Sequence, residues 1–161
     1  MKNLIAILCF IIFPHAAYSS HHIKEEPVDA YVLKIVDGDT IHATINDEIV
    51  KMRLAFIDCP ERNQPLGSEA TEALKEEILD RTVKVHIFNF DRYGRAITEI
   101  IANNYSVNLK LVMDGKCFVY RRYAKGMIEY FNAETSARSQ KKGVHSTDDF
   151  IKPWDWRKLR K

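Results

Sequence analysis

The chain has 161 residues, with 24 Lys and Arg against 22 Asp and Glu and a formal charge of +2. A balance this close to neutral excludes a partner held by net charge alone, so binding a polyanion would need a local basic cluster. The length is that of one domain with its own hydrophobic core, and no repeat or low-complexity segment divides the sequence.

Residues 1–19 are predicted to be an export signal. Lys2 gives a positive start, the run from Leu4 to Phe13 is apolar, and a suitable cleavage sequence ends at Ser19. The apolar run is short for a bilayer span, and an uncleaved membrane anchor is the alternative interpretation. We therefore expect an exported protein, periplasmic or secreted, in which residues 20–28 are a linker.

Five strands are expected to follow the linker. Apolar and polar residues alternate in them, and the sequences DGDT, NDE and DRYG supply turns between neighbours. In the first strand Tyr31 and Leu33 would share the apolar face, and in the third Met52 and Leu54 would do so, which turns Arg53 to the other side. The predicted strands are 31–36, 40–45, 49–57, 83–90 and 95–102.

Three helices complete the prediction. The first begins at Ser68 as its N-cap, the second covers about 106–114 and stops at Gly115, and the third covers about 127–142. CFVY at 117–120 is a brief extended piece, and 146–161 is expected to be an irregular basic tail. This order predicts a mainly β domain with helices over 29–145, built as a five-stranded OB-fold β-barrel.

Charged residues gather where the predicted strands end. Asp37 and Asp39 lie in the first turn, while Asp58 and Glu61 follow the third strand. Each has an ordinary explanation, since DGDT suits a hairpin turn. In a meander, however, the first turn and the end of the third strand meet at one end of the sheet. Asp39 and Asp58 would then converge, and two carboxylates with a backbone carbonyl are hard oxygen ligands suited to Ca²⁺.

Two arginines complete this constellation. Arg53 lies in the third strand and Arg95 follows the DRYG turn. A planar guanidinium can hold two phosphate oxygens at once, which a lysine cannot do. A metal ion, a carboxylate base and paired guanidinium groups are the working parts of phosphodiester hydrolysis.

Five sequence stretches occur in an order that resembles the staphylococcal nuclease (thermonuclease) family. They are KIVDGDTI, RLAFIDCPE, DRYGRAITEI, NLKLVMDGKCFVYRRY and ETSARSQKKGV. The resemblance covers nearly all of the chain after the leader. It implies an OB-fold barrel with three helices and a calcium-dependent nuclease that cuts DNA and RNA and leaves 3′-phosphates.

Positions matched to the family imply particular roles. The calcium ligands would be Asp39, Asp58 and the backbone carbonyl of Cys59, supported by Asp37 and Thr40. The catalytic residues would be Arg53, Glu61 and Arg95, with Glu61 as the general base. Substrate contacts would come from Arg92, Tyr93 and Tyr120.

The sequence departs from the family pattern at two places and leaves alternatives open. Cys59 stands where the reference enzyme has threonine, and the loop 62–67 is shorter. A disulfide between Cys59 and Cys117 is compatible with export but is not decided by the sequence. The alternative function is a non-catalytic nucleic-acid- or protein-binding module on the same barrel. We expect a monomer.

Overall fold

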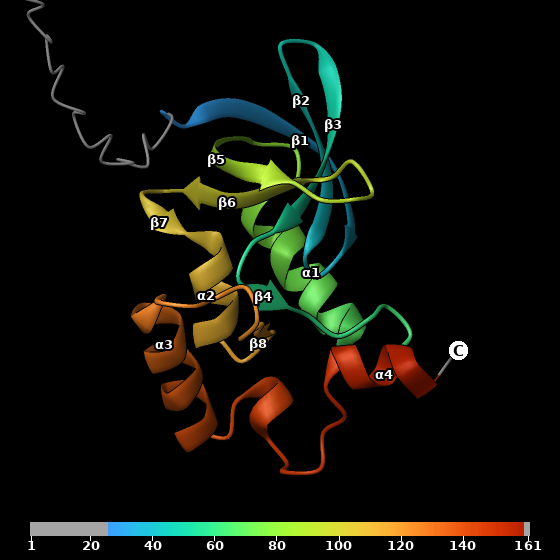
Figure 1. Ribbon diagram of the computed structural model, residues 1–161, viewed down its shortest axis with the longest axis vertical. Coiled ribbons are helices and arrows are strands. Elements are labelled where there is room, and N and C mark those ends of the chain that lie inside the picture. Colours follow the sequence, from blue (N-terminus) through green and yellow to red (C-terminus); the bar gives the residue numbers. More distant parts are fainter. Residues whose placement is uncertain (1–25, 160–161) are drawn as a thin grey trace, which may run out of the picture.

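The computed structural model describes residues 26–159 (Figure 1), so the predicted leader at 1–19 lies outside the described residues. The strands are β1 (Val28–Asp37), β2 (Thr40–Ile45), β3 (Glu48–Leu54), β4 (Ile57–Asp58), β5 (Thr82–Phe90), β6 (Ala96–Ala102), β7 (Tyr105–Ser106) and β8 (Phe118–Val119). The helices are α1 (Gly67–Ile78), α2 (Val107–Met113), α3 (Ile128–Ser139) and α4 (Pro153–Leu159), with a 3₁₀ turn at Gly143–His145.

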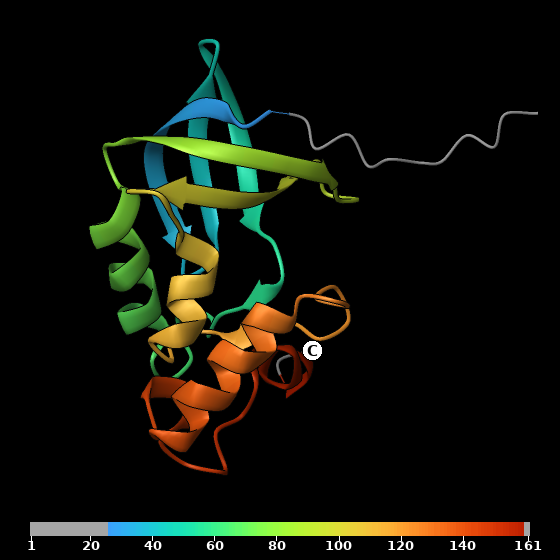
Figure 2. The same cartoon turned by 90° about the vertical axis from the view of Figure 1, so that its left-hand side faces the viewer.

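Five of the strands close into a barrel. The sheet order is β3-β2-β1-β5-β6, and neighbours in it are antiparallel. The barrel closes where β3 pairs in parallel with β6, with Met52 opposite Ala96 and Leu54 opposite Thr98. The predicted OB-like barrel is confirmed, and Figure 2 shows the helices packed beneath it.

The predicted third strand is broken in two. β3 ends at Leu54, and Phe56 takes a positive φ of 69° before β4 begins at Ile57. The buried amide of Asn108 donates to the carbonyls of Ala55 (3.2 Å) and Thr98 (2.9 Å) beside this break. The chain therefore leaves the barrel after Leu54, and β4 pairs with β8 instead. This change of direction carries Asp58 towards the helices.

The predicted apolar face of the first strand is the wrong one. Ala30 and Val32 are buried, whereas Tyr31 and Leu33 are exposed. A β-bulge interrupts the pairing of β1 with β2 between Val32 and Lys34. An extra residue in one strand shifts the alternation of the faces, so a regular two-residue pattern fails across it.

Helix α1 begins differently from the prediction, because Ser68 is not its cap. The helix starts at Gly67, and the preceding Leu66 lies in the left-handed region with φ 64°. A Cβ atom on Gly67 would lie 1.9 Å from the carbonyl oxygen of Glu61, so only glycine fits there. The second helix agrees with the prediction, and Ser106 caps it by accepting from the Leu109 N–H at 3.1 Å.

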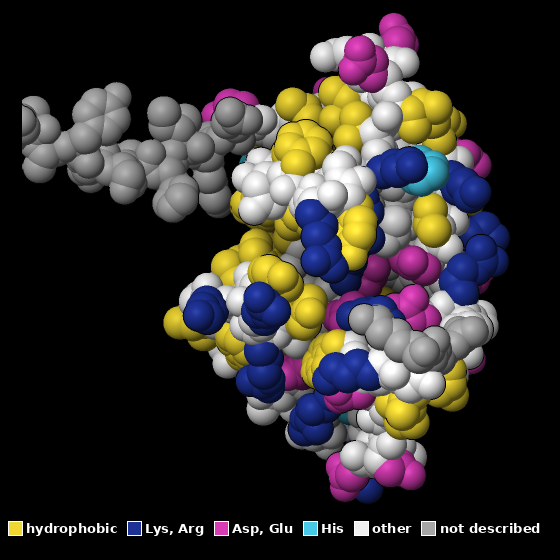
Figure 3. Space-filling view, turned by 45° about the vertical axis from the view of Figure 1, so that its right-hand side comes forward, with side chains coloured by type: hydrophobic (Ala, Val, Ile, Leu, Met, Phe, Trp, Pro, Cys, Tyr) yellow, Lys and Arg dark blue, Asp and Glu magenta, His cyan; other side chains and the backbone are white. Residues whose placement is uncertain are grey.

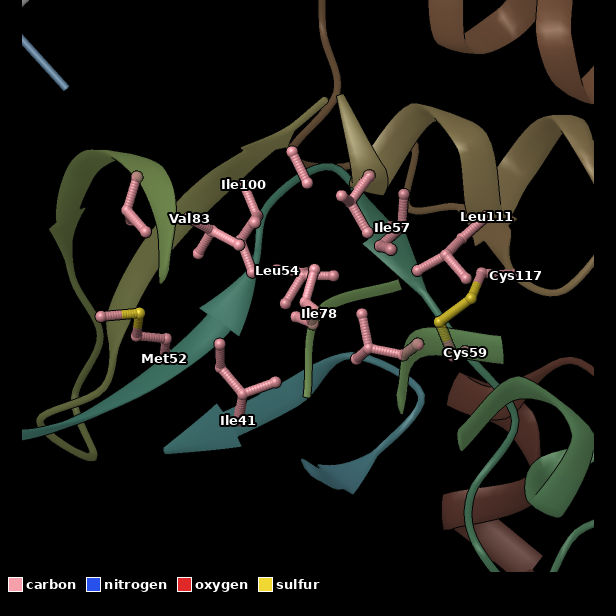
Figure 4. Close-up of a cluster of buried hydrophobic side chains, with 14 of the residues drawn as sticks. Ile41, Met52, Leu54, Ile57, Cys59, Ile78, Val83, Ile100, Leu111 and Cys117 are labelled. Atoms are coloured by element: carbon pink, nitrogen blue, oxygen red, sulfur yellow. A yellow bond between two sulfur atoms is a disulfide. The ribbon is translucent and has the colours of Figure 1, made fainter. Parts of the chain in front are cut away.

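The core fills the barrel and continues between the helices (Figure 4). Ile41, Leu54 and Ile100 lie within the barrel, and the cluster extends to Leu111 of α2. Next to Leu111 a disulfide joins Cys59 and Cys117, which the sequence had left open. The bond ties the end of β4 to the start of β8.

The predicted irregular tail is wrong for its final part, where Pro153–Leu159 form helix α4. Proline suits a first helical position because its fixed φ matches the helix and its missing N–H is not needed there. Among residues 26–159, no helix combines the length and the apolar character that a bilayer crossing needs.

Candidate active site

The first turn carries Asp39 and holds it from both sides. The Asp39 N–H donates to Oδ1 of Asp37 at 3.1 Å, and the Thr40 hydroxyl donates to Oδ1 of Asp39 at 3.3 Å. Gly38 lies against the disulfide, since a Cβ atom there would be 2.8 Å from the Cβ of Cys59. The glycine of DGDT thus lets the turn approach the end of β4 closely.

Two acidic side chains meet at the guanidinium of Arg53. Its Nη2 lies 3.1 Å from Oδ2 of Asp39 and 3.0 Å from Oδ1 of Asp58. The same nitrogen donates to the Ile57 carbonyl at 3.0 Å, and the Cys59 N–H donates to Oδ2 of Asp39 at 2.7 Å. The predicted convergence of Asp39 and Asp58 is therefore present in the structure. Figure 3 shows acidic side chains at the centre of one face, bordered by Lys and Arg.

Burial changes the acidity of Asp39. Its pKa is raised to about 7, chiefly by burial and also by the charges of Asp37 and Asp58. The Arg53 guanidinium and the Cys59 N–H act in the opposite direction and lower it. A cation that binds Asp39 would therefore compete with a proton close to neutral pH.

Glu61 lies at the rim of the acidic pair, in a loop that Gln64 organises. The Glu61 N–H donates to Oε1 of Gln64 at 3.1 Å, and the Gln64 N–H donates to the Glu61 carbonyl at 2.8 Å. Gln64 is itself buried, and its amide donates to the Ile151 carbonyl at 2.5 Å. The sequence analysis missed Gln64, because its role depends on a segment far along the chain.

Arg157 of α4 also reaches this site, and the sequence analysis missed it too. Its Nη2 lies 2.7 Å from Oδ2 of Asp58, and its Nη1 lies 3.2 Å from Oδ1 of Asp58 and 2.7 Å from Oε1 of Glu61. Burial lowers the pKa of Arg157, but the hydrogen bonds to Asp58 and Glu61 outweigh burial and raise it overall. The only signal in the sequence is an arginine directly after an aromatic pair, WDWR.

The turn between β5 and β6 forms a second group around Asp91. Arg95 donates from Nε to Oδ2 of Asp91 at 2.8 Å, and Nη2 lies 2.8 Å from the same oxygen. Partial burial raises the pKa of Asp91, but bonds from Arg95 and the Tyr93 N–H lower it overall. The Arg92 guanidinium lies over the Tyr93 ring, 4.8 Å from its centroid. Arg92 and Tyr93 are exposed, whereas Asp91 and Arg95 are half-buried and bonded to each other.

Arg53 lies in β3, and Arg95 lies in the turn directly before β6, the strand that pairs with β3. Arg53 pairs in register with Ile97, two residues after Arg95. Within residues 26–159, no hydrogen bond or salt bridge joins the Asp91 group to the Asp39 and Asp58 pair. The structure thus places the predicted arginines in two separately bonded groups, Arg53 with Asp39 and Asp58, and Arg95 with Asp91.

Tyr120, a predicted substrate contact, is covered by α4. Its ring stacks on Trp154 with centroids 5.7 Å apart and planes 11° from parallel. Phe118 packs edge-on against the same indole at 5.8 Å. Tyr120 therefore presents an aromatic face, but a residue of this chain already lies on it.

The residues at the acidic pair fit a divalent cation of the hard type. Residues 26–159 hold no cluster of three or more His, Cys, Asp or Glu placed to bind a metal ion together. However, oxygens of Asp39 and Asp58 contact one nitrogen of Arg53, so they lie close enough to share a cation. Carboxylate oxygens supplemented by backbone carbonyls and water are what Ca²⁺ accepts.

Comparison with known proteins agrees with this geometry. A family model described as "Staphylococcal nuclease homologue" matches residues 51–147. An "Uncharacterized endonuclease" of Escherichia coli O157:H7 is 35% identical over 127 residues, covering 78% of this chain and 82% of that protein. The chain belongs to the staphylococcal nuclease family.

Other staphylococcal nuclease relatives support the same assignment. A "Micrococcal nuclease" of Shigella flexneri is 33% identical over 140 residues, covering 81% of this chain and 80% of that protein. A "Probable staphylococcal-like nuclease" of Oryza sativa subsp. japonica is 30% identical over 125 residues, covering 75% of this chain and 34% of the longer plant protein. The family match ends at residue 147, before α4.

Proposed function

We propose that this chain is a calcium-dependent nuclease that hydrolyses phosphodiester bonds of DNA and RNA and leaves 3′-phosphates. The observation that carries the proposal is the meeting of Asp39 and Asp58 at Arg53, with Glu61 beside them. Relatives that are named nucleases support the reaction class. A bound cation would polarise the phosphate and offset its negative charge.

The cation would be held by Asp39, Asp58 and the backbone carbonyl of Cys59, with Asp37 and Thr40 orienting Asp39. The contacts from the Asp37 carboxylate to the turn and from the Thr40 hydroxyl to Asp39 support those two roles. Cys59 contributes through its backbone, because its sulfur is bonded to Cys117. The replacement of threonine by cysteine therefore leaves this ligand type unchanged.

Glu61 would act as the general base. It takes a proton from the attacking water, whose oxygen bonds to phosphorus while the bond to the 5′ oxygen breaks. The leaving 5′ oxygen then takes a proton from solvent water, Glu61 releases its proton to the solvent, and the phosphate stays on the 3′ side. Glu61 is partly exposed, with 34% of its side chain accessible, so water and substrate can reach it.

Arg53 and Arg95 would stabilise the negative charge that develops on the phosphate oxygens. Arg53 lies in β3, and Arg95 lies directly before β6, the strand that pairs with β3. Arg92, Tyr93 and Tyr120 would contact adjoining nucleotides, since an aromatic ring can stack on any base. Arg53 contacts Asp58, and Arg95 contacts Asp91.

Residues 1–19 would direct export to the periplasm or the medium, and the mature protein would act as a monomer. The disulfide supports export, because such bonds persist in oxidising compartments. N-terminal sequencing of the protein recovered from the periplasm and the medium tests both cleavage at Ser19 and location. Size-exclusion chromatography with light scattering tests the monomer.

The nuclease proposal is tested with purified mature protein on single-stranded DNA and on RNA. We expect cleavage with added calcium and none with excess chelator. Products should resist extension by a polymerase until a phosphatase has removed their 3′-phosphates. Equal cleavage in chelator would refute the calcium site, and binding of nucleic acid without any cleavage would favour the non-catalytic module.

A further inference from the structure

Helix α4 inserts one guanidinium into the acidic pair from outside the barrel. Arg157 contacts both carboxylate oxygens of Asp58, at 2.7 and 3.2 Å, and one of Glu61 at 2.7 Å. The Asp58 side chain is only 1% exposed, whereas Arg157 is 41% exposed. Arg53 contacts only Oδ1 of the buried Asp58 carboxylate, so the other oxygen, Oδ2, is bound by Arg157 from the solvent side.

This contact does not depend on Arg157 alone, because the segment before it is anchored independently. Trp154 stacks on Tyr120 and packs edge-on against Phe118. The Ile151 carbonyl accepts from the buried amide of Gln64 at 2.5 Å. These neutral contacts bring α4 to the rim and leave the Arg157 side chain to reach inward.

A guanidinium and a divalent cation cannot both hold Asp58 in this way. Arg157 uses Oδ1 and Oδ2 of Asp58, and Arg53 also contacts Oδ1. A cation that binds Asp58 must therefore displace Arg157 from at least one oxygen. Two positive groups around one buried carboxylate would also repel the incoming cation.

We propose that Arg157 competes with a divalent cation for Asp58 and Glu61 and thereby closes the active site until the cation binds. The segment 151–159 thus covers both the carboxylates of Asp58 and Glu61 and the ring of Tyr120, and we call this segment the latch. Binding of a divalent cation releases this segment as one unit: Arg157 leaves Asp58 and Glu61, and Trp154 leaves Tyr120, which opens the tyrosine ring to substrate. This inference rests on the proposed calcium site at Asp39 and Asp58.

The first test measures calcium affinity by isothermal titration calorimetry on the mature protein and two variants. Arg157→Gln removes the competing charge, and we expect the calcium dissociation constant to fall about two- to fivefold, the range expected for a partly exposed ion pair. Lys158→Gln is the matched control. It loses the same charge one position later, and its ammonium contacts Asp155 at 2.8 Å instead.

The second test needs no change at Arg157. Both tryptophans of the chain, Trp154 and Trp156, lie in α4, so intrinsic fluorescence reports on the latch. With wild-type protein, added calcium should shift the emission to longer wavelength and increase quenching by acrylamide, at the midpoint found by calorimetry. Trp156→Phe leaves Trp154 as the sole reporter and should show the same shift.

The outcomes separate the latch from the calcium site. If wild type and Arg157→Gln bind calcium with equal dissociation constants, the latch is overturned but the calcium site is retained. The same holds if calcium binds without a change in tryptophan emission. An equal gain in affinity from Lys158→Gln would also overturn it, because general charge would then explain the effect. If calorimetry detects no calcium binding by wild type or by either variant, both the proposed function and the latch are refuted.

Discussion

Removal of the Cys59–Cys117 disulfide should destabilise the protein by about 4 kcal/mol. The two cysteines are 58 residues apart in the sequence and both are buried. Closing a loop of this size restricts the unfolded chain by an entropy that is worth about 4 kcal/mol at 25 °C. The double variant Cys59→Ala with Cys117→Ala avoids leaving a reactive thiol in the core.

The assay is urea unfolding followed by far-ultraviolet circular dichroism, on wild type, on reduced wild type and on the double variant. With an m-value of about 2 kcal/mol per molar urea, the unfolding midpoint should fall by roughly 2 M. Reduced wild type should unfold near the double variant, because both lack the same cross-link.

A loss below about 1 kcal/mol would refute the reasoning, since a loop of this length predicts several times more. The site offers a second readout. The Cys59 N–H donates to Asp39, and the disulfide fixes the end of β4 from which Asp58 projects. We therefore expect weaker calcium binding in the double variant, measured at urea concentrations where it is still folded.

Two further predictions concern the acidic residues. Glu61→Gln should lower turnover about 10²–10⁴-fold, which is the contribution of a general base. The control variant Glu69→Gln, in the first turn of α1, should leave turnover unchanged. Near-full activity of Glu61→Gln in a steady-state assay would show that Glu61 is not the general base. Burial raises the folded pKa of Asp39 to about 7 from 3.8, so its contribution to stability is complete below pH 4 and lost as pH rises through 7. In chelator, urea unfolding should show the stability of wild type relative to Asp39→Asn falling by up to about 4 kcal/mol between pH 4 and 8, and a constant difference would contradict this.

Local signals were sufficient for much of the fold. Alternation and turn sequences located the barrel strands, and the meander they imply brought Asp39 and Asp58 to one end of the sheet. The same signals failed where a strand is irregular. The bulge after Val32 shifted the faces of β1, and the break at Phe56 divided a strand that reads as continuous.

The start of α1 shows a different kind of limit. Ser68 resembles an N-cap in the sequence, yet the helix begins one residue earlier, at Gly67, where the Glu61 carbonyl leaves no room for a side chain. The cause is a close approach between two parts of the 61–67 loop. Propensity rules weigh each residue by its neighbours in the chain and do not include such an approach.

The sequence by itself determined the barrel, the order of its charged turns and the family to which the chain belongs. These follow from periodicity, turn chemistry and motif order, which are local properties of the chain. Only the tertiary structure decided the disulfide and the insertion of Arg157, which contacts Asp58 from 99 positions away. Such contacts depend on how separate elements pack. The sequence alone therefore could not show that Arg157, among the basic residues of the tail, is the one that contacts Asp58.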